Sequence, residues 1–153
     1  MTEIQYNFET PANITLLITQ GATFRKRWRF RYGTTLLPFP FYSDADPGVL
    51  LWKGRCMFRA AYADAIPKVS LLSSSEPPGV TFDYVDDPAT GIRSVFYGLY
   101  MTGAQTAALT GGKLSSDGKK MDFVYDIEFE RLTDAWVIKP QAGKATAKLE
   151  ATK

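Results

Sequence analysis

The sequence predicts an all-β fold, a β-sandwich with one short helix, and two patterns support this most directly. Over residues 24–32, aromatic side chains dominate the even positions and arginines fill the odd ones. Because successive side chains of a strand point to opposite faces, this period of two places one face of the strand in a core and the other on a surface. The second pattern is a series of short strand-like runs separated by turn residues, with helix signals in a single segment.

The odd positions of this strand form a row of arginines, Arg25, Arg27, Arg29 and Arg31. Such a row can bind the phosphates of a nucleic acid while an aromatic ring stacks on a base. Trp28 has the opposite parity, however, so it cannot stack on a base that the arginines hold. We therefore expect a solvated or carboxylate-paired face, or contact with a protein partner, and no nucleic acid.

The first part of the chain divides into an arm and the beginning of the domain. Residues 1–12 are polar with scattered apolar positions, which is typical of an N-terminal arm or a peripheral strand. We expect residues 13–153 to form a single β-sandwich domain. A strand over residues 13–18 opens it, and Gly21, which tolerates a positive φ, marks the corner before the arginine strand.

The loop over residues 34–48 is too rich in proline to be a central strand, yet it is unusually apolar. Phe39, Phe41 and Tyr42 contribute much of this character. A loop of this kind packs over the end of a sandwich or, where it is exposed, forms a docking surface. We take these three side chains, together with the four arginines, as the candidate partner contacts.

Further strand-like runs follow the loop at residues 49–59, 68–72, 80–85 and 92–101. Cys56, the single cysteine, lies at an inward position of the first run, so we expect a small buried side chain and no disulfide. Thr102 and Gln105 form a capping-box pattern before the one expected helix, over residues 103–109, and a pair of glycines follows it.

An acidic strand is expected over residues 121–130, where aromatic and aliphatic side chains alternate with Asp126, Glu128 and Glu130. If it were the neighbour of the arginine strand in one sheet, the outer face would carry cross-strand Arg–Glu pairs, each contributing roughly 0.2–1 kcal/mol. Two more strands are expected at residues 135–138 and 145–149. These short strands together indicate an antiparallel sandwich of immunoglobulin-like type.

Length and composition fit one globular domain without catalytic chemistry. The chain has 153 residues, and its formal net charge of +2 is too small to indicate a nucleic-acid or anionic-membrane partner. It contains no histidine, the commonest general base and metal ligand, and no glycine-rich nucleotide motif. Asp83, Asp86 and Asp87 lack the ligand spacing of a calcium loop and are typical of a solvated turn. We expect no enzyme activity, no cofactor and no metal.

The remaining classes of partner are constrained less directly. No apolar run reaches the roughly 20 residues that span a bilayer, and the N-terminus lacks a signal-peptide pattern, so we expect a soluble protein made in a cytoplasm, with no membrane partner. A small-molecule ligand is not expected either. A sugar-binding sandwich would use exposed tryptophans, but strand parity favours a core position for both candidates, Trp52 and Trp136.

Six segments spread over nearly the whole chain follow a characteristic order. They are residues 20–24 (Gln-Gly-Ala-Thr-Phe), the aromatic strand containing Trp28, and residues 52–59, 106–109, 123–128 and 151–153. In this order and spacing the chain resembles a family of tailed-bacteriophage virion proteins, the small immunoglobulin-like β-domains of baseplates and necks. It departs from the family pattern at a proline-rich insert over residues 34–47 and at a break over residues 139–143.

The resemblance implies a non-enzymatic structural component of the virion, made in the cytoplasm of the bacterial host. It implies a place in the tail, as a baseplate or collar/neck component, with fibre anchoring as one such role. The partners would be other virion structural proteins, in multiple copies. Capsid decoration is the main alternative, and a carbohydrate- or host-surface-binding β-sandwich is a further one.

Overall fold

The computed structural model describes residues 3–6, 11–32 and 37–149. The chain forms two β-sheets packed as a sandwich, with one short helix, as the sequence predicts. The elements, in order, are β1 (Glu3–Tyr6), β2 (Ala12–Asn13), β3 (Leu16–Thr19), β4 (Phe24–Tyr32), β5 (Trp52–Arg59), β6 (Val69–Leu72), β7 (Val80–Asp86), β8 (Arg93–Met101), α1 (Gly103–Ala107), β9 (Lys113–Leu114), β10 (Lys120–Arg131) and β11 (Val137–Lys148).

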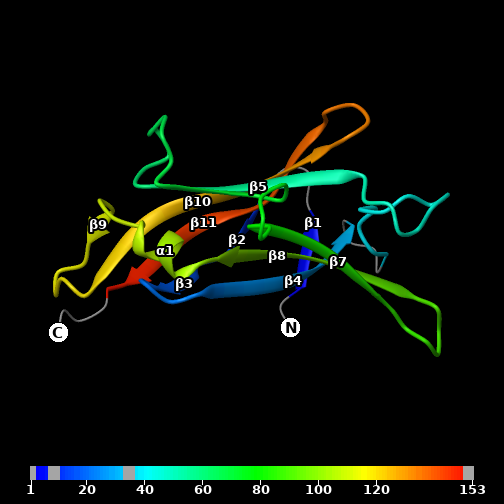
Figure 1. Ribbon diagram of the computed structural model, residues 1–153, viewed down its shortest axis with the longest axis horizontal. Coiled ribbons are helices and arrows are strands. Elements are labelled where there is room, and N and C mark those ends of the chain that lie inside the picture. The colour runs from blue at the N-terminus through cyan, green and yellow to red at the C-terminus, as the bar shows by residue number, and fades with distance from the viewer. Residues whose placement is uncertain (1–2, 7–10, 33–36, 150–153) are drawn as a thin grey trace.

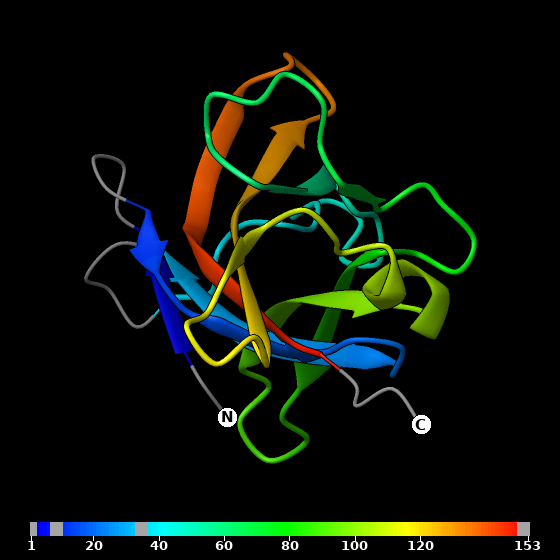
Figure 2. The same ribbon diagram turned by 90° about the vertical axis from the view of Figure 1, so that its left-hand side faces the viewer.

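The sheets differ in size and both are mixed. Sheet A has the strand order β1-β4-β8-β7, and sheet B has the order β2-β11-β10-β5-β6, with β3 paired to β11 and β9 paired to β10. Most neighbours are antiparallel, but β1 pairs with β4 in parallel, and both β2 and β3 pair with β11 in parallel. In Figure 1 sheet A forms the lower layer and β5, β10 and β11 the upper one, and Figure 2 shows both layers end on.

The arginine strand β4 and the acidic strand β10 lie in different sheets, so the condition for cross-strand Arg–Glu pairs between them is not met. Both strands turn an aromatic face inward, and these faces meet across the core, where the rings of Phe30 and Phe129 are 6.1 Å apart. A period of two identifies the buried face of a strand but not its neighbour in the sheet. The arginines and the carboxylates therefore occupy the two opposite outer faces of the sandwich.

The proline-rich loop between β4 and β5 closes one end of the core. Phe39 and Phe41 are 2% and 0% exposed, and the Phe41 ring lies 5.3 Å from that of Phe129. The indole Nε1 of Trp52 donates to the carbonyl of Pro40 at 3.1 Å, which fixes the loop to β5. Phe39 and Phe41 are therefore buried core residues in the folded chain, and their expected contact with a partner stays a prediction.

Strand β11 unites the two strands expected near the C-terminus. Its pairing with β10 shifts register between Ile127, which faces Gln141, and Phe129, which faces Ile138. The shift places two residues of β11, Lys139 and Pro140, opposite the single residue Glu128 of β10. Proline has no N–H to give to a ladder, and a bulge is where a strand tolerates it. The strand therefore continues through a segment whose sequence indicates a break.

The predicted helix is present as α1. The Thr102 side chain accepts from the Gln105 N–H at 3.2 Å, and the Gln105 side chain accepts from the Thr102 N–H at 2.9 Å. This reciprocal pair is the capping box that the sequence predicts. In the described part of the chain no helix is long and apolar enough to cross a membrane.

A buried chain of hydrogen bonds joins the two sheets to the N-terminal segment. The Tyr97 hydroxyl in sheet A donates to Gln141 Oε1 at 2.6 Å, and Gln141 Nε2 donates to the Tyr125 hydroxyl at 2.8 Å. Tyr125 in turn donates to the Ile14 carbonyl at 2.6 Å. Gln141 is fully buried, so each of these bonds satisfies a polar atom that water cannot reach.

Replacing Tyr97 by Phe tests this network. Tyr97→Phe leaves the buried Gln141 carbonyl without a donor, so we expect a loss of about 1–3 kcal/mol in the free energy of unfolding, measured by urea denaturation. Tyr100→Phe is the matched control, because Tyr100 faces outward on the same strand, and its loss should stay within about 0.5 kcal/mol. Equal losses in the two variants would contradict the role given to Gln141.

Candidate protein-interaction surface

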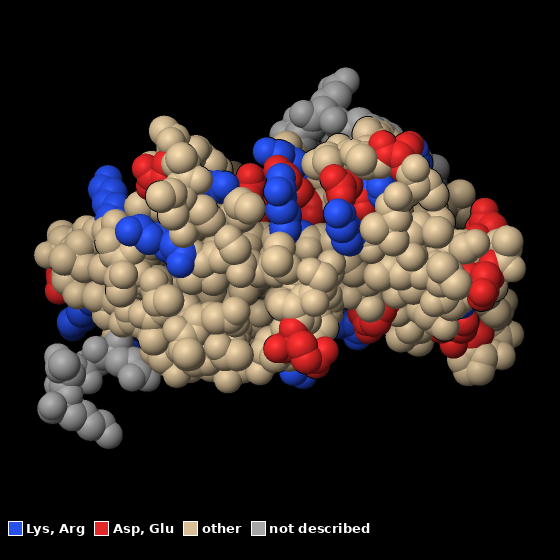
Figure 3. Space-filling view, turned by 45° about the horizontal axis from the view of Figure 1, so that its top comes forward, with Lys and Arg blue, Asp and Glu red and all other residues tan. Residues whose placement is uncertain are grey.

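The outer face of sheet B is a ladder of ion pairs along β10. Arg55 on β5 stands opposite Glu128, and its Nε donates to Glu128 Oε2 at 2.7 Å. Lys53 Nζ lies 2.7 Å from Glu130 Oε2 one pair further along. The remaining pairs are Lys139 with Glu128 and Asp126, Arg59 with Asp126, and Lys144 with Asp122. In Figure 3 basic and acidic side chains lie next to one another along the upper part of the molecule.

Glu128 is central to this ladder, and its side chain is only 13% exposed. Burial by itself raises the pKa of the Glu128 carboxyl, but hydrogen bonds from Arg55 and Lys139 outweigh it and hold the pKa below its ordinary value. Glu128 therefore stays ionised at neutral pH. Its charge is compensated by two cations from the flanking strands.

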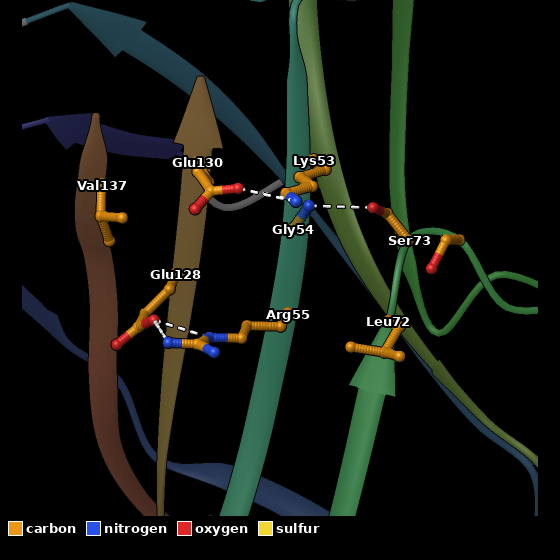
Figure 4. A pocket seen from close by; sticks show the side chains of 9 residues that line it. Lys53, Gly54, Arg55, Leu72, Ser73, Glu128, Glu130 and Val137 are labelled. Carbon is orange, nitrogen blue, oxygen red and sulfur yellow. Dashed lines mark hydrogen bonds and ion pairs between the residues drawn. The ribbon is translucent and has the colours of Figure 1, made fainter. Parts of the chain in front are cut away.

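A hollow of about 320 Å³ lies on the same face, and Figure 4 shows the side chains around it. Its charged walls are the Lys53–Glu130 and Arg55–Glu128 pairs, already engaged with each other. Ser73 Oγ accepts from the backbone N–H of Gly54 at 2.9 Å. These polar groups of the hollow are thus already engaged in contacts within the fold.

The outer face of sheet A is built differently, from the arginines of β4 and aromatic residues of β8. Arg25 stands opposite Tyr100, Arg27 opposite Gly98 and Arg29 opposite Phe96. Phe96 is only 8% exposed although it lies on the outer face. We call Arg25, Arg27, Arg29 and Arg31, with Phe96 and Tyr100, the arginine face.

Arg27 is neutralised by a carboxylate of the fold. Its side chain reaches across β8 to β7, where Nε donates to Asp83 Oδ1 at 3.2 Å and Nη2 pairs with Asp83 Oδ2. On the way the guanidinium lies 3.7 Å from the centre of the Phe96 ring, a cation–π contact. Gly98, which stands between Arg27 and Thr81 in the register, has no side chain to block this path.

Arg25 and Arg29 differ from Arg27. Neither forms an ion pair with a carboxylate whose side chain the structure describes, and Glu3 of β1 stands opposite Arg29 in the register. Arg25 is exposed, with its guanidinium 5.1 Å from the centre of the Tyr100 ring, and Arg29 is half-buried. Arg31 is half-buried at the far end of the row, where its backbone pairs with Pro38.

Tyr42 lies apart from the arginine face. It is half-buried where the proline-rich loop meets the β7–β8 hairpin, and its ring lies 4.8 Å from that of Tyr84. Arg93 covers both rings, and its Nε donates to Asp86 Oδ1 at 2.7 Å. The structure therefore brings the four predicted arginines together on one face and separates them from all three predicted loop residues.

Phe96 and Tyr100 of the arginine face, and Asp83, which pairs with Arg27 there, were not predicted from the sequence. The signal for the two aromatics is weak, because residues 95–101 are apolar on both parities and only Gly98 interrupts the outward set. Asp83 could be identified only from the register of β7 on β8, which places it opposite Phe96. The sequence of β7 alone does not contain that information.

The carboxylates around β7 do not form a metal site. Asp83 pairs with Arg27, Asp86 pairs with Arg93, and Asp87 accepts the N–H of Ala89 at 2.8 Å within a turn. Among the described residues, no group of three or more His, Cys, Asp or Glu side chains is placed to hold a metal ion. Cys56 is fully buried, and burial raises the pKa of its thiol well above the ordinary value.

Comparison with known proteins adds no family to these observations, because no family model and no curated protein matches the chain.

Glu128 gives a testable pH dependence. Because the folded state lowers its pKa from 4.5, its contribution to stability is complete above about pH 4.5 and is lost as the pH falls through the folded-state pKa. We expect Glu128→Gln to lower the free energy of unfolding by about 0.5–1 kcal/mol at pH 7, and this difference to shrink towards pH 3 in urea titrations. A difference that stayed constant over that range would show that ionisation of Glu128 is not its source.

Proposed function

We propose that the chain is a non-enzymatic assembly module of a tailed-bacteriophage virion, a tail component of the baseplate or collar/neck, which contacts its neighbours through the arginine face. The order of the six motif segments supports the family. The observation that carries the contact is the contrast between the two outer faces. On sheet B the ladder along β10 pairs its carboxylates with cations of the flanking strands, whereas on sheet A Arg25 and Arg29 form no ion pair with a carboxylate whose side chain the structure describes.

Arginine suits such a contact for physical reasons. Its planar guanidinium forms two parallel hydrogen bonds to a carboxylate, stacks on aromatic rings and is more weakly hydrated than an ammonium group. It is enriched in protein interfaces for these reasons. On this face, rings from β8 already support Arg25 and Arg27, which limits the side-chain entropy lost on binding.

Capsid decoration and sugar binding are the alternative functions, and they would use different surfaces of the molecule. Capsid decoration would use the same face and differs only in the position of the chain in the particle. A sugar-binding site would need an exposed aromatic platform, and Trp52 is 2% exposed with its indole N–H bonded to Pro40. Trp136, 40% exposed beside the Arg131 guanidinium, is the one tryptophan whose ring remains accessible.

Mass spectrometry of purified phage particles tests the proposed class. We expect the chain among the virion proteins in multiple copies, and cryo-electron microscopy of the particle should place it in the tail. Its absence from mature particles would reject the virion role. Density on the capsid shell would instead select decoration.

A charge reversal tests the proposed contact. Arg25→Glu with Arg29→Glu should leave the thermal transition of the isolated protein nearly unchanged, because neither side chain is in an ion pair of the fold, while incorporation into particles falls by roughly tenfold or more, equivalent to about 1.4 kcal/mol. Lys120→Glu with Lys148→Glu is the matched control, with the same change in net charge at two exposed lysines that face each other on sheet B. Equal incorporation of the two variants would contradict the contact.

A further inference from the structure

We infer that the arginine face binds an acidic, extended segment of a partner protein, whose carboxylates engage Arg25 and Arg29. This inference rests on the proposed function, because it assigns the chemistry of the partner at the same surface. Three observations indicate this kind of partner. They are the spacing of Arg25 and Arg29, the neutral Arg27–Asp83 pair between them, and the contacts that aromatic rings of the face already make with arginines.

The spacing of the arginines fits an extended acidic segment. Alternate residues of a strand recur every 6.6–6.8 Å or so, and therefore Arg25 and Arg29 are about 13 Å apart along β4. A partner in extended conformation presents carboxylates at the same repeat when acidic residues occupy alternate positions.

The neutral pair between these cations favours discrete carboxylates over a polyphosphate. Arg27 lies midway between Arg25 and Arg29 and is already paired with Asp83. The Arg27–Asp83 pair therefore interrupts the row of arginines, with Arg25 on one side of it and Arg29 and Arg31 on the other. A nucleic-acid backbone carries a charge at every nucleotide and would place phosphates against the Asp83 carboxylate.

The aromatic rings also argue against a nucleic acid. Proteins that bind single strands offer exposed rings on which bases stack. Here Phe96 is 8% exposed beneath the Arg27 guanidinium, and Arg25 lies over Tyr100. These rings stabilise the arginines, so they are not free to receive bases.

A groove beside the arginine face gives the segment a place for an uncharged side chain. It has a volume of about 400 Å³ and lies where β4 and β8 meet the loop before β7. Its lining includes the apolar surfaces of Pro77, Pro78 and Leu99, together with Arg25, Tyr100, Thr81 and the Arg27–Asp83 pair. A partner residue next to the carboxylate that binds Arg25 can pack against these apolar surfaces.

Fluorescence anisotropy with the purified protein tests the inference. The probe is a labelled peptide of about 12 residues in which Glu and Thr alternate, long enough to span the row of arginines. We expect binding that weakens several-fold between about 50 and 300 mM salt. Arg25→Glu with Arg29→Glu should weaken it at least tenfold, whereas Lys120→Glu with Lys148→Glu should change it less than twofold. If circular dichroism shows that the protein with Arg25→Glu and Arg29→Glu does not fold, the variant with Arg25→Gln and Arg29→Gln replaces it.

Two further probes decide between classes of ligand. A peptide in which Lys and Thr alternate should not bind, and an oligothymidine of the same number of units should bind more weakly than the acidic peptide. Tighter binding of the oligothymidine, or equal loss of peptide binding in both charge-reversed proteins, would overturn the inference. So would failure of the wild-type protein to bind the acidic peptide.

The result of the peptide-binding assay can be interpreted independently of the test of the proposed virion role. The anisotropy assay uses the isolated chain, whereas the virion role is tested on purified particles. Peptide binding by a chain that is absent from particles would reject the virion role alone. A chain that is present in particles but does not bind the peptide would reject the acidic partner alone.

Discussion

The contact on which the rest of the structure depends is the packing of aromatic side chains between the two sheets. Phe30 of sheet A lies 6.1 Å from Phe129 of sheet B, and Tyr97 lies 5.0 Å from the same ring. Burying each large apolar side chain contributes about 1.5–3 kcal/mol, and aromatic pairs add about 0.5–1.5 kcal/mol. Because each strand alternates, the choice of the inward face also decides the outward one. The arginines of β4 are on the surface as a consequence of the aromatics being in the core.

The two surfaces that result are electrostatically unequal. On sheet B the acidic strand lies between two strands that carry cations, so the ladder is compensated locally and contributes to the fold. On sheet A, Arg27 pairs with Asp83 of β7, and Arg25 and Arg29 form no ion pair with a carboxylate whose side chain the structure describes. This difference between faces, and not the small net charge of +2, gives the chain a side suited to an acidic partner.

The sequence predicts the individual elements well and their arrangement less well. The alternation in β4, the capping box at Thr102 and the buried Cys56 depend on local chemistry, and the structure confirms all three. Which strands are neighbours in a sheet depends on register and topology, and a period of two in the sequence encodes neither. The pattern therefore does not reveal that β4 and β10 are in different sheets. Pro140 indicates a break where a bulge allows β11 to continue. The apolar character of the proline-rich loop allows either packing over the end of the sandwich or an exposed docking surface, and the structure buries Phe39 and Phe41 in the core.

Chemical modification of the arginines tests the central claim, that the arginine face is the contact surface, most directly. Phenylglyoxal reacts with accessible guanidinium groups, and mass spectrometry gives the rate at each residue in the free protein and in purified particles. We expect Arg25 and Arg29 to react in the free protein and to be protected in the particle, while Arg131, on the β10–β11 hairpin, reacts at a similar rate in both. Equal reactivity of Arg25 and Arg29 in the two states would contradict it.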